Sequence, residues 1–346
     1  MDGPSSISSA RATDLVTRYR FSKPRGWITI AIVSALVIGS GLPATAQEEV
    51  VPEPSVMKPL ASRTLTLDAF VVDDAFVAVG ERGHILISTD GGETWQQQQS
   101  PTRTALTGVY FHDRDRGWVV GHDSAILRTS DGGTTWELVS WAPEDEAPFF
   151  DVWFSDADNG IAIGAYGAYY ETTDGGATWS SRWISEDDWH LHKIARADNG
   201  TLYIAAEAGS FYRSDDGGEN WVSLPTEYQG SYFGVLPLEG DSVLLFGLRG
   251  HLFRSDDAGE SWQELDTGTV AMLTDGQVLN DGTILIAGLG GTILASSDGG
   301  QTFTLHQQTN RRGISSVVET GDGSLLLVGE FGVKIAALSE LTAGTE

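Results

Sequence analysis

The chain of 346 residues contains no cysteine. This absence excludes disulfide bonds, a thiolate nucleophile, cysteine ligands for a metal and a cysteine that could carry a lipid. Basic residues are also few: 21 Lys and Arg stand against 48 Asp and Glu, and the formal net charge is −27. Nucleic acids and anionic membrane surfaces repel a protein this acidic, so we expect neither as a partner.

The sequence also lacks a long amphipathic helical pattern and a glycine-rich loop that leads into a helix. The first absence excludes helical repeat proteins, and the second excludes the usual phosphate-binding loops. We therefore expect an architecture of β-strands and no bound cofactor.

The first 46 residues have the pattern of an export signal. Basic residues up to Arg25 precede an uncharged apolar run at 27–38, and Ala44-Thr45-Ala46 ends the segment. A membrane-spanning helix needs about 20 apolar residues, so we expect cleavage after Ala46 and no direct membrane insertion afterwards, with an uncleaved anchor as the alternative. This pattern predicts a periplasmic or secreted protein, or one of the thylakoid lumen if the source is photosynthetic. Residues 47–56 are acidic and contain proline, which predicts a flexible lead-in.

A nine-residue segment at 87–95, Ile-Ser-Thr-Asp-Gly-Gly-Glu-Thr-Trp, recurs in near copies along the chain. Six copies share an aromatic residue five positions after an aspartate, and successive aspartates are 41, 43, 42, 41 and 41 residues apart. A fixed period of this length is the signature of a repeat fold. The aspartate and aromatic residues of these Asp boxes are Asp90 and Trp95, Asp131 and Trp136, Asp174 and Trp179, Asp216 and Trp221, Asp257 and Trp262, and Asp298 and Phe303.

Each period contains four short strand patterns separated by turn residues, as the second period shows at 105–111, 118–121, 125–129 and from 136 onward. Four strands in about 41 residues are typical of one blade of a β-propeller. Gly332, which lies 41 residues after Gly291 and precedes a third strand pattern, indicates a seventh period that lacks its own fourth strand. We therefore predict that 57–346 form an all-β propeller of seven four-stranded antiparallel blades. We expect an N-terminal strand at 56–63 to complete the last blade and close the ring.

The Asp boxes themselves are predicted to be structural. An aspartate in a tight turn accepts hydrogen bonds from the backbone of that turn, and the glycines supply positive φ angles. We expect the terminal aromatic residue to be buried between blades. A calcium loop needs several oxygen ligands at alternate positions and a closing bidentate glutamate, which the box lacks.

The Asp box is shared with the BNR/Asp-box propellers, which include sialidases and sortilin-like receptors. The longer unit that runs from Gly117 to Trp136 resembles the photosystem II assembly/stability factor family and its bacterial relatives. This resemblance covers essentially all of the chain after the leader. It implies a seven-bladed, exported, non-enzymatic propeller that binds a membrane-associated protein partner. The photosynthetic members assist assembly of the photosystem II reaction centre.

One face of such a propeller collects the turns between second and third strands together with the loops between blades. These turns vary within a repetitive frame, which is typical of a binding surface on a rigid scaffold. We call this surface the turn face. Its candidate partner-binding residues are Arg82, His122, Asp123, Tyr166, Trp189, Glu207, Arg249, Arg311, Arg312, Glu330 and Phe331.

Three alternatives remain open at this point. The chain could be an accessory factor of an envelope or export complex in a non-photosynthetic bacterium. It could be a secreted sialidase-like hydrolase, although the regular repeats leave little room for the arginines, tyrosine and acids of that chemistry. His190 and His192 could join Asp187 or Asp188 in a metal site. We expect neither catalytic nor metal-binding residues.

Overall fold

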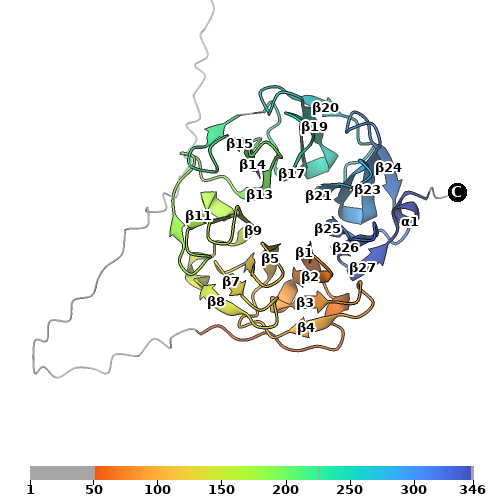
Figure 1. The fold of residues 1–346 in the computed structure, drawn as a ribbon. Coiled ribbons are helices and arrows are strands. Elements are labelled where there is room, and N and C mark those ends of the chain that lie inside the picture. Colours follow the sequence, from red (N-terminus) through yellow and green to blue (C-terminus); the bar gives the residue numbers. More distant parts are fainter. Residues whose placement is uncertain (1–50, 225, 344–346) are drawn as a thin grey trace, which may run out of the picture. The chain divides into compact units, whose positions relative to one another are not determined.

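The computed structural model describes residues 51–224 and 226–343. The predicted leader, residues 1–46, lies outside these residues, so its cleavage stays a prediction. Within the described part, seven antiparallel sheets are arranged in a ring (Figure 1). This arrangement confirms the predicted all-β, seven-bladed propeller.

Strands follow one another in each blade from the inner edge to the outer edge. The first four blades are β1 (Thr66–Val72), β2 (Ala75–Gly80), β3 (Ile85–Ser88) and β4 (Gln96–Gln98); β5 (Leu106–Phe111), β6 (Gly117–Gly121), β7 (Ile126–Thr129) and β8 (Glu137–Ser140); β9 (Phe149–Phe154), β10 (Gly160–Gly164), β11 (Tyr169–Thr172) and β12 (Ser180–Ser181); and β13 (Leu191–Arg196), β14 (Leu202–Ala206), β15 (Phe211–Ser214) and β16 (Val222–Ser223).

The remaining blades are β17 (Tyr232–Pro237), β18 (Val243–Gly247), β19 (Leu252–Ser255) and β20 (Gln263–Leu265); β21 (Leu273–Val278), β22 (Ile284–Gly288), β23 (Thr292–Ser296) and β24 (Thr304–Gln307); and the three-stranded β25 (Ile314–Glu319), β26 (Leu325–Gly329) and β27 (Gly332–Ala336). Short helical turns are η1 (Ala61–Arg63), η2 (Glu81–Gly83), η3 (Pro143–Asp145), η4 (Ala165–Gly167), η5 (Leu248–Gly250), η6 (Leu289–Gly291) and α1 (Leu338–Thr342). No helix in the described residues has the length and apolar character to cross a bilayer.

The second strand of every blade forms the core of its sheet. All residues of β2, β6, β10, β14, β18, β22 and β26 are buried. Neighbouring strands cover their edges and neighbouring blades cover their faces, so these strands are apolar on both sides, as in the Gly-Ile-Ala-Ile-Gly sequence of β10. Burial of apolar surface between blades is the main force that holds such a ring together.

The expected N-terminal strand is not confirmed. The last sheet has three strands, and residues 61–63 form η1 instead of pairing with β27. Pro59 has no backbone N–H to donate to a strand partner. The preceding residues bond to the first blade instead, where the Ser55 N–H donates to the Ser100 carbonyl at 2.9 Å and the Lys58 N–H donates to Gln97 Oε1 at 2.7 Å.

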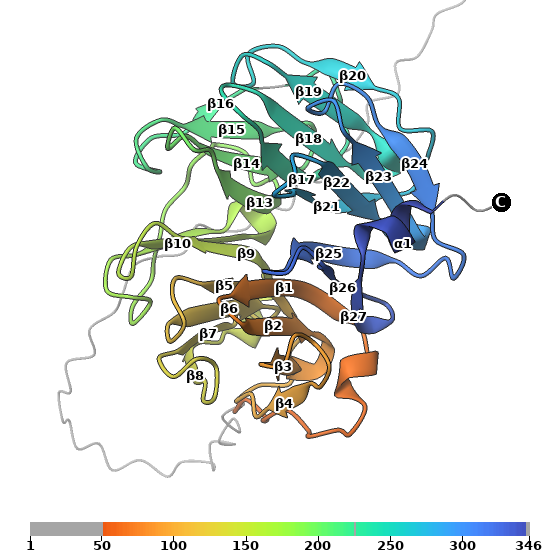
Figure 2. The ribbon, with the colours of Figure 1, turned by 45° about the vertical axis from the view of Figure 1, so that its right-hand side comes forward.

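Apolar packing closes the ring between the first and last blades. Phe76 and Ala78 of β2 share one buried cluster with Leu326 and Val328 of β26, and Ala61 of η1 completes this cluster. The two blades lie side by side in both ribbon views (Figures 1 and 2). Closure therefore depends on side-chain burial rather than on a shared strand.

A β-bulge interrupts the start of every inner strand. In β1 the ladder with β2 shifts between Thr66 and Asp68, and equivalent shifts occur in the other six inner strands. A bulge adds one residue without a direct cross-strand partner and redirects its side chain. The seven extra residues are Leu67, Thr107, Phe150, His192, Phe233, Thr274 and Ser315.

Candidate binding site around the axial cavity

The six Asp boxes form hydrogen-bonded turns of one kind. In the first box, Ser88 Oγ donates to Asp90 Oδ1 at 2.8 Å, and the Gly92 N–H donates to Ser88 Oγ at 2.9 Å. The Thr94 N–H donates to Asp90 Oδ1 at 2.9 Å. The other five boxes repeat these three bonds. Hydrogen bonds from Thr94 lower the pKa of Asp90 to about 2. The carboxylate is thus engaged by its own turn, which fits a structural role.

The box aromatics are less uniformly buried than expected. Trp136 is buried with 8% exposure, whereas Trp95, Trp179, Trp221, Trp262 and Phe303 are half-buried. Trp136 packs edge-on against Phe111 and donates its ring N–H to the Gly133 carbonyl. Solvent therefore reaches part of the aromatic ring in five of the six boxes.

On the turn face, second and third strands are joined by tight turns with two left-handed residues. In the first blade these are Arg82 and Gly83, with φ angles of 58° and 70°, and the His84 N–H bonds to the Glu81 carbonyl. Tyr166 and Arg249 hold the same left-handed position in the third and fifth blades. Such type I′ turns favour Asn-Gly, so arginine and tyrosine are unusual occupants.

The structure brings together some of the predicted partner-binding residues. Tyr166 packs edge-on against His190 at 5.1 Å between ring centroids, and His190 Nδ1 lies 3.6 Å from a carboxylate oxygen of Glu207. The Trp189 carbonyl accepts a bond from the Gly167 N–H. In a second group, Arg312 bonds to the Glu330 carbonyl and lies 6.0 Å from the ring centre of Phe331. The remaining candidates, which lie on other turns and loops, are Arg82, His122, Asp123, Arg249 and Arg311.

Most of these side chains are accessible. Tyr166 is 55% exposed and Trp189 is 36% exposed. Asp123, Glu207 and Phe331 are half-buried, and the other candidates are exposed.

Sequence reasoning missed a cavity on the propeller axis. We call this cavity of about 100 Å³ the axial cavity. All seven inner strands contribute to its wall, because the bulged residues Leu67, Thr107, Phe150, His192, Phe233, Thr274 and Ser315 all line it. The next residue in four of these strands lines it too, namely Asp68, Lys193, Asp275 and Ser316. The cavity is close to the turn face, because backbone bonds such as Glu207 N–H to the His190 carbonyl join the turns to the residues just before the inner strands.

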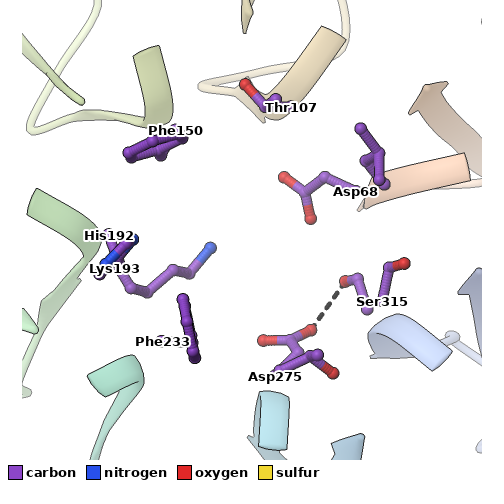
Figure 3. A pocket seen from close by; sticks show the side chains of 11 residues that line it. Asp68, Thr107, Phe150, His192, Lys193, Phe233, Asp275 and Ser315 are labelled. Carbon is purple, nitrogen blue, oxygen red and sulfur yellow. Dashed lines mark hydrogen bonds between the residues drawn. The ribbon is translucent and has the colours of Figure 1, made fainter. Parts of the chain in front are cut away.

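Charged groups of both signs lie in or beside this cavity. Figure 3 shows Asp68 and Lys193 extending toward one another, with Asp275 beside them. Lys193 Nζ lies 3.3 Å from Asp151, which is buried behind the cavity wall. One ammonium group is therefore in contact with Asp151 and within electrostatic range of Asp68 and Asp275.

The three aspartates also link neighbouring blades. Asp68 Oδ2 accepts the Val109 N–H, Asp151 Oδ2 accepts the Ile194 N–H and Asp275 Oδ2 accepts the Val317 N–H, each at 3.0 Å. Ser316 Oγ donates to Asp275 Oδ2 as well. Within the described residues, no group donates a hydrogen bond to Oδ1 of Asp68 or of Asp275.

Burial changes the proton affinity of this group. Burial raises the pKa of Asp68 to about 7. Lys193 lowers this pKa, and Asp151 and Asp275 raise it further. Burial also raises the pKa of Asp151, while the neighbouring aspartates raise the pKa of Lys193 despite its burial. Lys193 is therefore charged at neutral pH, and Asp68 titrates near neutrality.

Aromatic rings connect the turn face to the cavity. Tyr166 contacts His190, His190 lies 5.9 Å from Phe150, and Phe150 stacks on His192 at 5.3 Å. His192 in turn lies 4.7 Å from Phe233. We call these five residues the aromatic track. Burial, with a smaller contribution from His190, lowers the pKa of His192 to about 4, so this ring is neutral at physiological pH.

The metal alternative finds no support in this geometry. The His190 and His192 rings are 6.1 Å apart at 84° to one another, and both contact aromatic neighbours. The described residues contain no group of three side chains placed to ligate a metal. The bulge at His192 breaks the alternation that would have placed both rings on one side of the strand.

The cavity residues could have been found from the repeats by comparing equivalent positions. Asp68, Asp151, Lys193 and Asp275 all stand two residues after the start of an inner strand. Charged residues at that inner position are costly to bury without partners, so their recurrence in four of seven blades is a usable signal.

Comparisons with known proteins agree with this fold. The family model of the Photosynthesis system II assembly factor YCF48 matches residues 94–149 and 142–335, and the BNR/Asp-box repeat model matches residues 86–97. No curated protein matches the sequence.

Solved structures share the architecture. A structure described as YCF48 bound to D1 peptide has a TM-score of 0.66 at 20% identity, covering 86% of this chain and 100% of that chain. YCF48 from Cyanidioschyzon merolae has a TM-score of 0.65 at 18% identity, covering 82% and 98%. The WD40 propeller domain of Doa1 has a TM-score of 0.64 at 12% identity, covering 83% and 96%.

Identities this low establish the fold alone. The family model, by contrast, extends over more than half of the sequence, from the first Asp box to the last blade. The chain therefore belongs to the Photosynthesis system II assembly factor YCF48 family of Asp-box propellers.

Proposed function

We propose that this chain is an exported, non-catalytic propeller that binds a segment of a membrane-associated protein on its turn face and acts as an assembly factor. One observation carries the proposal: exposed aromatic and charged side chains of the turn face lead into a cavity walled by all seven blades. Aromatic residues in such positions supply much of the binding energy at protein interfaces. A family relative whose structure is described as bound to a D1 peptide supports a peptide segment as the ligand.

Site-specific photocrosslinking tests this proposal. A benzophenone amino acid at position 166 or 189 would sample the turn face, and the same group at position 198 would sample the opposite face, where Asp198 is an exposed turn residue. We expect a defined crosslinked membrane protein from 166 and 189 and none from 198. Equal labelling from both faces, or none from the turn face under several growth conditions, would contradict the proposal.

Export and the lack of catalysis need separate measurements. The proposed export predicts that the protein purified from the envelope begins at Gln47, which N-terminal sequencing can check. A panel of fluorogenic sialosides and glycosides should show no turnover. Turnover that disappears in Tyr166→Phe or Arg249→Ala would establish the hydrolase alternative instead.

The partner class can be narrowed by the neighbouring genes. Photosystem or pigment genes would support assembly of a photosystem in the thylakoid lumen. Transporter genes would favour the accessory factor of an envelope or export complex.

A further inference from the structure

We propose that the axial cavity receives a single arginine or lysine side chain from the bound segment, and that the aromatic track seats the apolar residues beside it. This inference rests on the proposed function and specifies the partner's chemistry. The bound segment would then be an extended stretch in which one basic residue is flanked by apolar ones.

The charges of the cavity favour a cation. Lys193 lies 3.3 Å from Asp151 and offsets that buried carboxylate. Asp68 and Asp275 then remain as two carboxylates without a cationic partner in contact within the described residues. Charges withdrawn from water are normally paired, so a cation that enters the cavity would restore the balance. An anion would meet three carboxylates against one ammonium group.

Each of these two carboxylates has one oxygen atom that accepts no hydrogen bond from the described residues. Oδ2 of Asp68 and Oδ2 of Asp275 are engaged by backbone N–H groups of the next blade. These bonds fix both carboxylates and leave each Oδ1 available to an incoming donor. Guanidinium and ammonium groups are suited to such acceptors because they carry several N–H donors and a positive charge.

The aromatic residues favour the same ligand independently of the carboxylates. Phe150, His192 and Phe233 line the same cavity and continue outward through His190 to the exposed Tyr166. Aromatic faces attract cations and also pack against aliphatic side chains. The cavity volume of about 100 Å³ has room for the charged end of an arginine or lysine side chain. The aromatic track offers a longer contact surface to the apolar residues beside it.

Binding of three short peptides tests the proposal. The probes are the acetylated, amidated pentapeptide Gly-Leu-Arg-Leu-Gly and two versions in which citrulline or glutamate replaces arginine. Citrulline keeps the shape of arginine but carries no charge. By calorimetry at pH 8 and low salt, we expect the arginine peptide to bind at least about tenfold more tightly than the citrulline peptide. We expect no binding of the glutamate peptide.

Matched variants assign the effect to the cavity. In Asp68→Asn and Asp275→Asn the amide oxygen can still accept the inter-blade N–H, so the fold is retained while the charge is removed. Each substitution should weaken binding of the arginine peptide about tenfold. The double variant should bind the arginine and citrulline peptides equally. Phe150→Ala should lower the affinity for every peptide that the wild-type protein binds. Asp198→Asn removes one charge from the opposite face and should change nothing.

Equal binding of the arginine and citrulline peptides, or arginine binding that Asp68→Asn and Asp275→Asn leave unchanged, would overturn the proposal. So would failure of the arginine peptide to bind at millimolar concentration. The proposed function would survive these results if crosslinking from position 166 still captured a membrane protein. Loss of that crosslink would instead refute the proposed function itself.

Discussion

At position 249 an arginine holds a backbone conformation that suits glycine or asparagine. Its φ of 58° is left-handed, and Gly290 takes the equivalent position in the sixth blade with a φ of 66°. Residues with a Cβ atom pay a conformational cost there. An exposed arginine at this position makes sense if its side chain serves a contact outside the chain.

Arg249→Asn should therefore stabilise the fold by about 0.5–1 kcal/mol, because asparagine adopts the left-handed conformation at lower cost. Urea denaturation followed by tryptophan fluorescence measures the change. Arg196→Asn is the control, since Arg196 is an exposed strand residue without a positive φ angle. A loss of stability in Arg249→Asn would show that the arginine supports the turn.

Asp68 makes stability depend on pH in a predictable direction. Its pKa is about 7 in the folded protein, whereas a free aspartate titrates near 3.9. The folded state therefore binds more protons between about pH 4 and 7, and stability from this group is lost as pH rises through that range.

The variant Asp68→Asn cannot titrate, so its stability relative to the wild type should be greater at pH 8 than at pH 5. Urea denaturation at both pH values gives this difference. Asp198→Asn, which changes an exposed turn residue of the opposite face, is measured alongside it as the control. If the difference for Asp68→Asn were independent of pH, the carboxyl group would have an ordinary pKa.

At the level of the element, the Asp-box turns differ in how deeply their aromatic ring is buried. Trp136 is enclosed by Phe111 and by residues of the first two blades, whereas Phe303 in the sixth box is half-buried. The same turn geometry therefore supports different amounts of packing around the ring.

Trp136→Ala should cost about 3–5 kcal/mol of unfolding free energy, as expected for a buried aromatic side chain. Phe303→Ala should cost about half as much or less, because solvent already reaches part of its ring. Chemical denaturation of the two variants compares the boxes directly. Equal losses would mean that the turn, rather than the packing of the aromatic ring, limits stability.

Sequence patterns predicted the strands, the tight turns and the Asp boxes, and missed the bulges and the axial cavity that they line. Gly83 and its equivalents marked the tight turns because only a few residues accept positive φ angles there. No residue type in the sequence indicated the bulge at His192, since bulges need no particular residue type. Asp68 and Lys193 were missed because they belong to different blades, and only the closed ring brings them to one cavity.

At the scale of the whole molecule, we expect stability to be most sensitive to substitutions where the first and last blades close the ring. The sequence suggested a strand exchange because 56–63 align with an outer strand, but Pro59 and the bonds to Gln97 and Ser100 direct that segment elsewhere. Closure then rests on the cluster that Ala61 shares with Phe76 and Leu326.

Removal of the residues that precede Lys58 should therefore cost only about 1–2 kcal/mol, corresponding to the lost hydrogen bonds. Ala61→Glu should cost more, because it places a charge in the closing cluster, where Ala61 is 2% exposed. Thermal unfolding should remain a single transition in the shortened protein. Failure of the shortened protein to fold would show that the N-terminal segment closes the ring after all.

The seven bulges place side chains that line the axial cavity outside the paired positions of the strand ladders. A bulged residue such as Phe150 or Phe233 has no direct cross-strand partner, so another side chain can replace it without disturbing the ladder. Thr107 and Thr274 differ, because their hydroxyls donate to carbonyls of the next blade. The ring can therefore acquire a new ligand preference by single substitutions at the other bulged positions. This freedom makes the axial cavity the natural place to retarget the protein by design.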